Sequence, residues 1–575
     1  MTRKIPMRAH TTCTFIPVAL FGLLMGLPPA AFAAEAIDHL NVQEPTRPEY
    51  LPAKPEEGFQ LPPVSPEPAI PAPGAAGESV WIDQIRFRGN RVIPTSELAA
   101  VAAGYAGRSL DAAGLEDLRQ KLSRHYVDRG YINSGALLGK EAIDGDTVTF
   151  DIIEGRLSEV RLHGLERLNE NYLRQRLTRS SDGALNVDTL RERFQLLLDD
   201  PLFERLNARL IPDARLGEAI LDVEVLRARP YQLTAFANNY RPPSIGSNVY
   251  GLSGWLRNLT GQGDVLNGSV QDSTQGGANG RYSVGWQMPL NQIGTRLSFQ
   301  YDHEDSTVIE DPLQDLDIKS VLDTRDFGLS QVFVETLQHK LTLGVNRVDR
   351  KNSTTLLGRR FSFIPGEPDG VTRVSAWRFW QEYAYRSESQ VLALRSTFTS
   401  ARNNAQEIAG LPAGTPQPDS HYTIWLGQAQ YARRVLENGA QFILIGNLQQ
   451  TQDRLLPLDR MSIGGVHTVR GYRENQMIRD TGTIVNVEFD YPLVRNPGKG
   501  FNLSLIPFYD YGRGKNQSEP ADTLSSMGLV TRMRWEGVSL DFSFAKRLNH
   551  PDFVRSNGGN LQDKGINFQL NYNFF

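Results

Sequence analysis

The arginine and the carboxylates between residues 470 and 510 are the side chains best suited to a specific polar contact. Arg470 lies in Val469-Arg470-Gly471-Tyr472, and Asp510 lies in Phe508-Tyr509-Asp510. A guanidinium makes parallel, charge-assisted hydrogen bonds to a carboxylate. Solvent weakens such a pair less inside a narrow channel, such as the lumen of a β-barrel, than on a protein surface. The two segments could therefore latch together. The alternative is an ordinary solvated arginine, whose exposed pairing contributes about 0 to 1 kcal/mol.

Alternation along two predicted strands turns acidic side chains toward one side. Residues of equal parity share a face of a strand. One face is apolar, with Val485, Val487, Phe489, Phe501, Leu503 and Leu505. The other face carries Asn486, Glu488, Asp490, Asn502, Ser504, Phe508 and Asp510. Glu488 and Asp510 would thus point toward an arginine on a loop folded over that face, unless a bulge shifts the parity.

Motifs typical of enzymes are missing from the sequence. It contains no H-E-x-x-H, no G-x-S-x-G, no phosphate-binding G-x-x-x-x-G-K-[ST] loop and no cluster among its nine histidines. A net charge of -4 at pH 7 gives no bulk attraction to nucleic acid. We therefore expect no enzyme activity, cofactor, metal site or nucleic-acid partner. An outer-membrane hydrolase with carboxylates in its loops is the remaining enzyme alternative.

The N-terminal 77 residues are predicted to comprise a signal peptide and a linker. Residues 1–33 have a basic start, the apolar stretch Phe15–Leu27 and a small-residue cleavage site at their end. That stretch is too short for the roughly 20 residues of a spanning helix. Residues 34–77 begin with Ala36–Val42, two helical turns at most, and continue as a proline-rich extended spacer. Cys13 is the only cysteine, so the mature chain is expected to have no disulfide.

Residues 78–155 and 156–229 are predicted to form two tandem α/β modules. Each has an opening strand, Val80–Phe87 in the first module, then two helices and two closing strands, so the topology repeats. The helices are expected from about Pro94, at Asp111–Asp128, at Asn169–Leu177 and at Val187–Leu198. The edges of such small mixed sheets can take up an extended peptide as an added strand.

Residues 230–575 are predicted to form a membrane β-barrel of about sixteen antiparallel strands, apolar outside and wet within. Segments of about ten residues alternate between apolar and polar side chains and are separated by Gly, Asn, Asp and Pro. In the last segment the apolar face carries Ile566, Phe568, Leu570, Tyr572 and Phe574. Lipid forbids open sheet edges, so a membrane sheet of this length must close on itself. A soluble β-sandwich is the alternative, although it would seldom need so long a meander without helices.

The order of these segments resembles the two-partner secretion transporters (TpsB proteins) of the ShlB/FhaC/HecB haemolysin secretion/activation type, over nearly the whole mature chain. The sharpest markers are Val469-Arg470-Gly471-Tyr472 and Phe508-Tyr509-Asp510. The resemblance implies that the modules are POTRA domains and that residues from about 451 to 480 form a loop folded into the lumen, latched through Arg470 to Asp510, Phe508 and Glu488. It also implies that Phe575 is a C-terminal assembly signal. A short plug helix is implied too, and Ala36–Val42, shorter than such a helix, is the only segment in the right place.

This resemblance implies an outer-membrane translocator, with its POTRA modules in the periplasm, that recognises and secretes a large exoprotein carrying an N-terminal β-rich secretion domain. Outer-membrane lipids and the barrel-assembly machinery are its other expected partners. A general barrel insertase of the same superfamily is the nearest alternative, and such insertases commonly carry more than two modules. An outer-membrane porin is a third class, although a porin needs neither the modules nor the Val469–Tyr472 loop.

Overall fold

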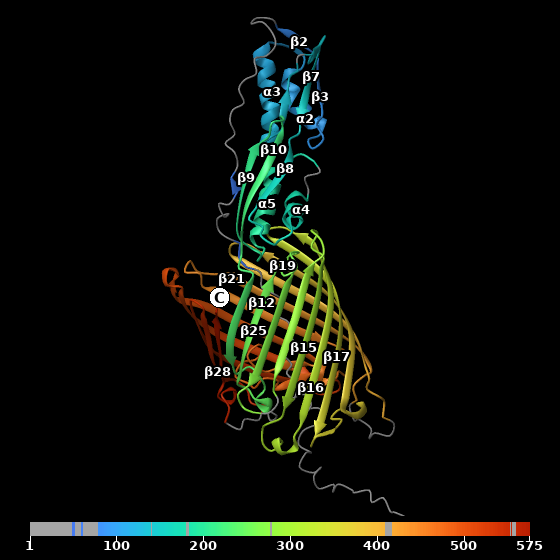
Figure 1. The fold of residues 1–575 in the computed structure, drawn as a ribbon, viewed down its shortest axis with the longest axis vertical. Coiled ribbons are helices and arrows are strands. Elements are labelled where there is room, and N and C mark those ends of the chain that lie inside the picture. Colours follow the sequence, from blue (N-terminus) through green and yellow to red (C-terminus); the bar gives the residue numbers. More distant parts are fainter. Residues whose placement is uncertain are drawn as a thin grey trace, which may run out of the picture.

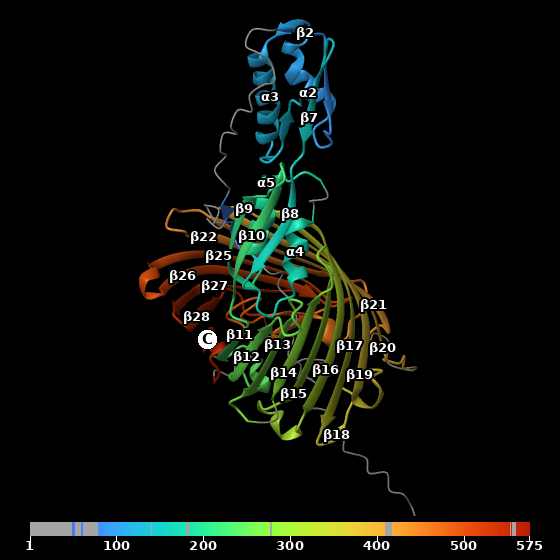
Figure 2. The same ribbon diagram turned by 45° about the horizontal axis from the view of Figure 1, so that its top comes forward.

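A computed structural model describes residues 49–51, 59–60, 79–139, 141–179, 183–276, 279–408, 417–551, 554 and 559–574. The predicted signal peptide, the short helix expected at Ala36–Val42 and the terminal Phe575 lie outside the described residues. The described chain has two parts: two α/β modules stacked end to end, and a closed barrel beneath them (Figure 1). Figure 2 shows the second module standing over one mouth of the barrel.

The first module packs two helices against small sheets. Its elements are β2 (Val80–Ile82), β3 (Gln84–Arg88), α2 (Thr95–Ala102), β4 (Arg108–Leu110), α3 (Ala112–Val127), β5 (Gly135–Leu137), β6 (Ile143–Asp144) and β7 (Thr147–Ile153). The opening strand expected at Val80–Phe87 is two strands, since β2 pairs with β4 whereas β3 pairs in parallel with β7. Leu118, Leu122 and Phe150 are fully buried in the core between helices and sheet.

The second module repeats this order and has a more continuous sheet. Its elements are β8 (Arg156–His163), α4 (Glu170–Thr178), α5 (Val187–Leu198), β9 (Phe203–Pro212) and β10 (Glu218–Arg227). The side-chain oxygens of Asn169 and Asn186 cap the two helices by accepting backbone N–H bonds. The sheet order is β1-β9-β10-β8, in which the short β1 (Phe59–Gln60) adds in parallel to β9. None of the described helices is long and apolar enough to cross a membrane.

The barrel ring contains sixteen antiparallel strands within the described residues, which confirms the predicted fold class. They are β11 (Tyr231–Asn238), β12 (Val249–Arg257), β13 (Val265–Ser273), β14 (Arg281–Pro289), β15 (Arg296–Thr307), β16 (Lys319–Glu335), β17 (His339–Leu356), β19 (Val371–Arg386), β20 (Gln390–Asn403), β21 (His421–Arg434), β22 (Gln441–Gln450), β25 (Thr481–Asn496), β26 (Phe501–Lys515), β27 (Asp522–Trp535), β28 (Val538–Arg547) and β29 (Ile566–Asn573). The two-residue β18 (Arg359–Arg360) pairs antiparallel with the last two residues of β17, and β17 itself pairs directly with β19. The ring closes where β11 pairs with β29.

Alternation along the strands separates an outer apolar face from an inner face. Phe327, Trp377 and Phe544 are exposed on the outer face, whereas the inner-face side chains of Gln428 and Asn447 are buried. The paired register keeps this alternation in step from one strand to the next. The outer face therefore has the apolar character that a membrane barrel presents to lipid.

Candidate functional site

The chain between β22 and β25 folds back against the inner wall, and we call residues 451–480 the infolded loop. It contains β23 (Met461–Ile463) and β24 (Met477–Arg479), which pair with each other and do not join the ring. Where this hairpin meets β26 the wall carries glycine, because a Cβ atom at Gly512 would overlap the side chains of Ile463 and Val469. The wall sequence thus leaves room for close approach of the loop.

Arg470 of the infolded loop pairs with Asp510 of β26. The Nε and Nη2 atoms donate to the two carboxylate oxygens at 2.8 and 2.7 Å, and the backbone N–H of Arg470 donates to Oδ2 at 3.0 Å. The side chain of Asp510 is fully buried and that of Arg470 is 7% exposed. This is the bidentate, charge-assisted geometry in which both charges are withdrawn from solvent and neutralise each other.

Glu488, Phe508 and Asn486 complete the surroundings of this pair. Glu488 Oε1 accepts from Arg470 Nη1 at 2.7 Å, and the guanidinium carbon lies 3.6 Å from the centre of the Phe508 ring. Asn486 Nδ2 donates to Asp510 Oδ1 at 2.8 Å. In the register of β25 and β26, Asn486 lies opposite Asp510 and Glu488 opposite Phe508. Four wall residues on two adjacent strands therefore converge on one arginine.

The other three residues of the predicted motif also contact the wall. Val469 is fully buried in an apolar cluster of loop and wall side chains. Gly471 has a φ of +90°, a conformation that favours glycine, and its carbonyl accepts from Arg547 Nε at 2.6 Å. The hydroxyl of Tyr472 donates to the Asn549 carbonyl at 2.6 Å. The structure thus brings every motif residue against the β25–β28 side of the barrel.

Arg473, which sequence reasoning missed, forms a second ionic cluster. Its Nε and Nη2 donate to the Asp563 carboxylate at 2.6 and 2.8 Å, and its Nη1 donates to Glu310 at 3.0 Å. The only signal in the sequence was its position next to the motif, since both acidic partners lie outside the strands, Glu310 in a loop and Asp563 in the short 3-10 helix Gln562–Lys564. Within the described ranges, no group of three or more His, Cys, Asp or Glu residues could hold a metal ion.

One part of the inner wall is apolar, which corrects the expectation of a lumen that is wet throughout. Inward-facing side chains of β16 to β21 form the patch: Leu322, Val348, Val374, Ala376, Ala401, Tyr422 and Ile424. Leu455, Leu456 and Leu458 of the infolded loop cover it. Beside them, Arg350 pairs with Asp459 of the loop. The loop is therefore held by apolar contacts on one part of the wall and by ion pairs on another.

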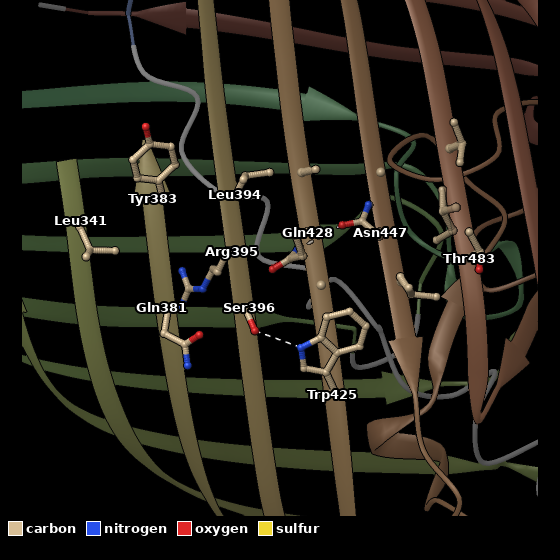
Figure 3. A pocket seen from close by; sticks show the side chains of 16 residues that line it. Leu341, Gln381, Tyr383, Leu394, Arg395, Ser396, Trp425, Gln428, Asn447 and Thr483 are labelled. Atoms are coloured by element: carbon tan, nitrogen blue, oxygen red, sulfur yellow. Dashed lines mark hydrogen bonds between the residues drawn. The ribbon is translucent and has the colours of Figure 1, made fainter. Parts of the chain in front are cut away.

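An apolar hollow lies on the outer face of the barrel. Figure 3 shows Leu394 and Trp425 at this hollow, with Trp425 Nε1 donating to Ser396 Oγ at 3.0 Å. Gly427 and Gly446 also line it, and their missing side chains create the depression. These positions share the outward parity of the strands, so the hollow faces the surroundings of the barrel and is separate from the lumen.

The linker and the second module both contact the barrel mouth on the module side. The hydroxyl of Tyr50 donates to Gln441 Oε1 at 2.9 Å. At the same mouth, the backbone N–H of Asn169 in the second module donates to the carbonyl of Gly261 at 2.8 Å. Chain segments on the module side thus lie next to the entrance of the lumen.

Comparisons with known proteins match both parts of the chain. The family described as haemolysin secretion/activation protein ShlB/FhaC/HecB matches residues 217–535, and the ShlB-type POTRA domain matches residues 80–155. The heme/hemopexin transporter protein HuxB of Haemophilus influenzae (strain 86-028NP) is 23% identical over 80% of this chain and 80% of its own length. The outer membrane transporter CdiB of Dickeya dadantii (strain 3937) is 21% identical over 80% of this chain and 81% of its own length. The solved structure of CdiB from Escherichia coli has the same fold, with a TM-score of 0.67 at 19% identity over 89% of this chain and 94% of that one.

Proposed function

This chain belongs to the haemolysin secretion/activation protein family ShlB/FhaC/HecB and is an outer-membrane transporter of two-partner secretion, and we propose that its exoprotein is captured on a module edge and passes through the lumen beside the latched loop. The transporter is not an enzyme, and its POTRA modules lie in the periplasm. The observation that carries the proposal is the buried cluster of Arg470, Asp510 and Glu488, which holds the infolded loop against one side of the wall.

The proposed cargo is a large exoprotein with an N-terminal β-rich secretion domain, which reaches the modules unfolded. An unfolded chain of high β-propensity can pair its backbone with an exposed sheet edge. Outer-membrane lipids are proposed to surround the apolar outer face, and the barrel-assembly machinery is proposed to insert the barrel. The family match supports an exoprotein partner, and the open edges of the module sheets support this mode of capture.

The edge of β9 in the second module supports capture by strand addition. This strand is ten residues long, and the linker strand β1 pairs with it only at Ala208 and Arg209. Since β1 already lies there as an added parallel strand, the edge has room for an extended chain. The exposed N–H and C=O groups of a strand edge are ready partners for such a chain. We therefore propose that the exoprotein first contacts β9 and displaces β1 from its edge.

Site-specific photocrosslinking tests this docking edge. A photoreactive side chain at Arg205, an exposed position of β9, should cross-link an exoprotein arrested during export. The matched control is Gln175, an exposed position of helix α4 in the same module, which should give no cross-link. Equal yields from both positions, or none from Arg205, would contradict docking on β9.

The latch is proposed to keep the infolded loop out of the path of the exoprotein. Without Arg470, the buried carboxylate of Asp510 loses its cationic partner, which disfavours the docked loop. A detached loop would then lie free in the lumen. Secretion of the exoprotein should therefore fall in Arg470→Ala and in Asp510→Ala, measured in cells whose barrels are assembled. Normal secretion from both variants would remove the latch from the mechanism.

The driving force is proposed to be folding of the exoprotein outside the cell. The sequence has no phosphate-binding loop, and the periplasm supplies no nucleotide for hydrolysis. A chain that folds after it emerges cannot return through the lumen, so folding gives the transport a direction. Export of a folding-defective exoprotein at the normal rate would count against this source of energy.

A further inference from the structure

The seam between β11 and β29 is the joint that closes the barrel, and its backbone ladder is short. All eight residues of β11 pair with β12, whereas only Thr234 to Asn238 pair with β29. A closed barrel has no free edges, so opening of this joint would expose unpaired backbone groups to lipid. Additional contacts at the end of the joint remote from the modules therefore have a direct effect on closure.

The side chain of Asn239 continues the ladder past the last strand residue. Its Oδ1 accepts from the backbone N–H of Phe568 at 2.9 Å, and its Nδ2 donates to the carbonyl of Ile566 at 2.9 Å. The backbone N–H of Asn239 still donates to the carbonyl of Phe568 at 3.4 Å, and the side-chain oxygen accepts from the backbone N–H of Phe568 in place of a backbone carbonyl. Asn239 is itself fully buried, so both of its polar groups need these partners.

Gln562 joins both sides of the seam to the infolded loop. Its fully buried amide donates through Nε2 to the carbonyls of Asn239 at 2.6 Å and of Arg241 at 2.8 Å. Its Oε1 accepts from the backbone N–H of Glu474 in the infolded loop at 2.9 Å. Gln562 lies in the segment that leads into β29, whereas Asn239 and Arg241 follow β11. One side chain therefore connects the chain after the first strand, the chain before the last strand, and the loop.

Two arginines strengthen this junction on the loop side. Arg473 of the infolded loop makes its paired hydrogen bonds to Asp563, the residue after Gln562. Arg547 of β28 donates to the carbonyl of Gly471 in the loop and to the carbonyl of Asp563 at 3.2 Å. The loop is thus attached to the segment that leads into β29 independently of Arg470.

We propose that the docked infolded loop stabilises the pairing of β11 with β29 through Gln562, at the end of the seam remote from the modules. We call this arrangement the clasp, and Gln562 is its positioning residue. The seam is then stabilised by the docked loop, and release of the loop weakens closure. Loss of the Gln562 amide leaves the carbonyls of the buried residues Asn239 and Arg241, and the partly buried N–H of Glu474, without that partner. Buried polar groups are costly when they are not hydrogen-bonded. This inference concerns closure of the barrel and does not depend on how the exoprotein is captured.

Hydrogen exchange of the full-length protein in lipid nanodiscs tests the clasp. Gln562→Met preserves side-chain length and removes the amide, so exchange of the paired amides of β11 and β29 should become about tenfold faster or more. The matched control is Gln428→Met, because Gln428 is also a buried glutamine but lies on β21, away from the seam. It should leave exchange in β11 and β29 unchanged. A general loss of stability would instead raise exchange throughout the ring.

A second variant approaches the clasp from the loop. Asp563→Asn keeps the Gln562 amide and removes the charge that pairs with Arg473. Exchange at the same seam amides should rise, by less than in Gln562→Met. If Gln562→Met yields no assembled barrel, Asp563→Asn decides alone. The proposal would be overturned if the variants that assemble a barrel exchanged their β11 and β29 amides at the rate of the unmodified protein. Continued secretion of the exoprotein by these variants would leave the proposed function intact.

Discussion

Replacing Arg470 with alanine should release the infolded loop from the β25–β26 wall. The arginine side chain makes two hydrogen bonds to Asp510 and one to Glu488, and Asp510 is fully buried. Removing one partner of a buried ion pair costs about 3–5 kcal/mol, because the other charge remains buried without compensation. Since about 1.4 kcal/mol corresponds to a factor of ten, the released loop should become roughly 100-fold to a few thousand-fold more populated relative to the docked loop.

Thiol labelling at Thr468 measures this release. Thr468 is buried beside the motif, and Cys13, the only cysteine of the sequence, lies in the predicted signal peptide. A water-soluble maleimide should therefore label Thr468→Cys about 100-fold or more faster when Arg470→Ala is also present. The control is Arg191→Ala, because the Arg191–Asp188 pair on helix α5 of the second module is 40% and 66% exposed. An exposed pair contributes about 0 to 1 kcal/mol, so labelling should change by less than about fivefold.

A double-mutant cycle shows whether Arg470 and Asp510 act as one unit. Asp510→Ala should speed labelling of Thr468→Cys as well, and the double variant Arg470→Ala/Asp510→Ala should speed it by less than the product of the two single effects. Each variant is first checked for a folded barrel by its heat-dependent migration on a gel. Parent-like labelling in a folded Arg470→Ala barrel, or single effects that simply multiply, would refute the coupling of these two charges.

Three further changes give sharp outcomes. Gly512→Leu should detach the hairpin of the infolded loop, because even a Cβ atom overlaps Ile463, and the maleimide assay should report fast labelling in an assembled barrel. Tyr472→Phe should destabilise the docked loop by about 1 kcal/mol through loss of the bond to Asn549, which the same assay reads as a roughly fivefold faster rate. Asn186→Ala should cost about 0.5–2 kcal/mol of local stability by uncapping α5, seen as faster amide exchange confined to the second module, and unchanged exchange there would contradict the cap.

Much of the architecture follows from sequence periodicity. The alternation around Glu488 and Asp510 gave the inward face correctly, since the irregularity in the pairing of β25 falls between Pro492 and Val494, beyond these residues. The parity of a strand depends only on its own residues, so it can be counted before the barrel is known. The number of strands in the ring followed from the same pattern.

Contacts that depend on barrel closure could not be predicted in this way. Gln562 meets Asn239 because the last strand returns beside the first, and Asp563 meets Arg473 because the infolded loop reaches the segment before β29. These residues lie outside the barrel strands, in segments whose positions no periodicity determines. The inner apolar patch was missed for a related reason: inward residues such as Val348 are covered by the infolded loop, and alternation alone indicates a face without indicating what covers it.

The path of the exoprotein is tested most directly by cross-linking from two adjacent wall residues. Gln300 and Phe299 lie next to each other on β15 and point to opposite faces, Gln300 toward the lumen and Phe299 outward. With an exoprotein arrested during export, a photoreactive side chain at Gln300 should cross-link the exoprotein, whereas one at Phe299 should cross-link only lipid. Cross-links to the exoprotein from Phe299 and none from Gln300 would contradict transport through the lumen.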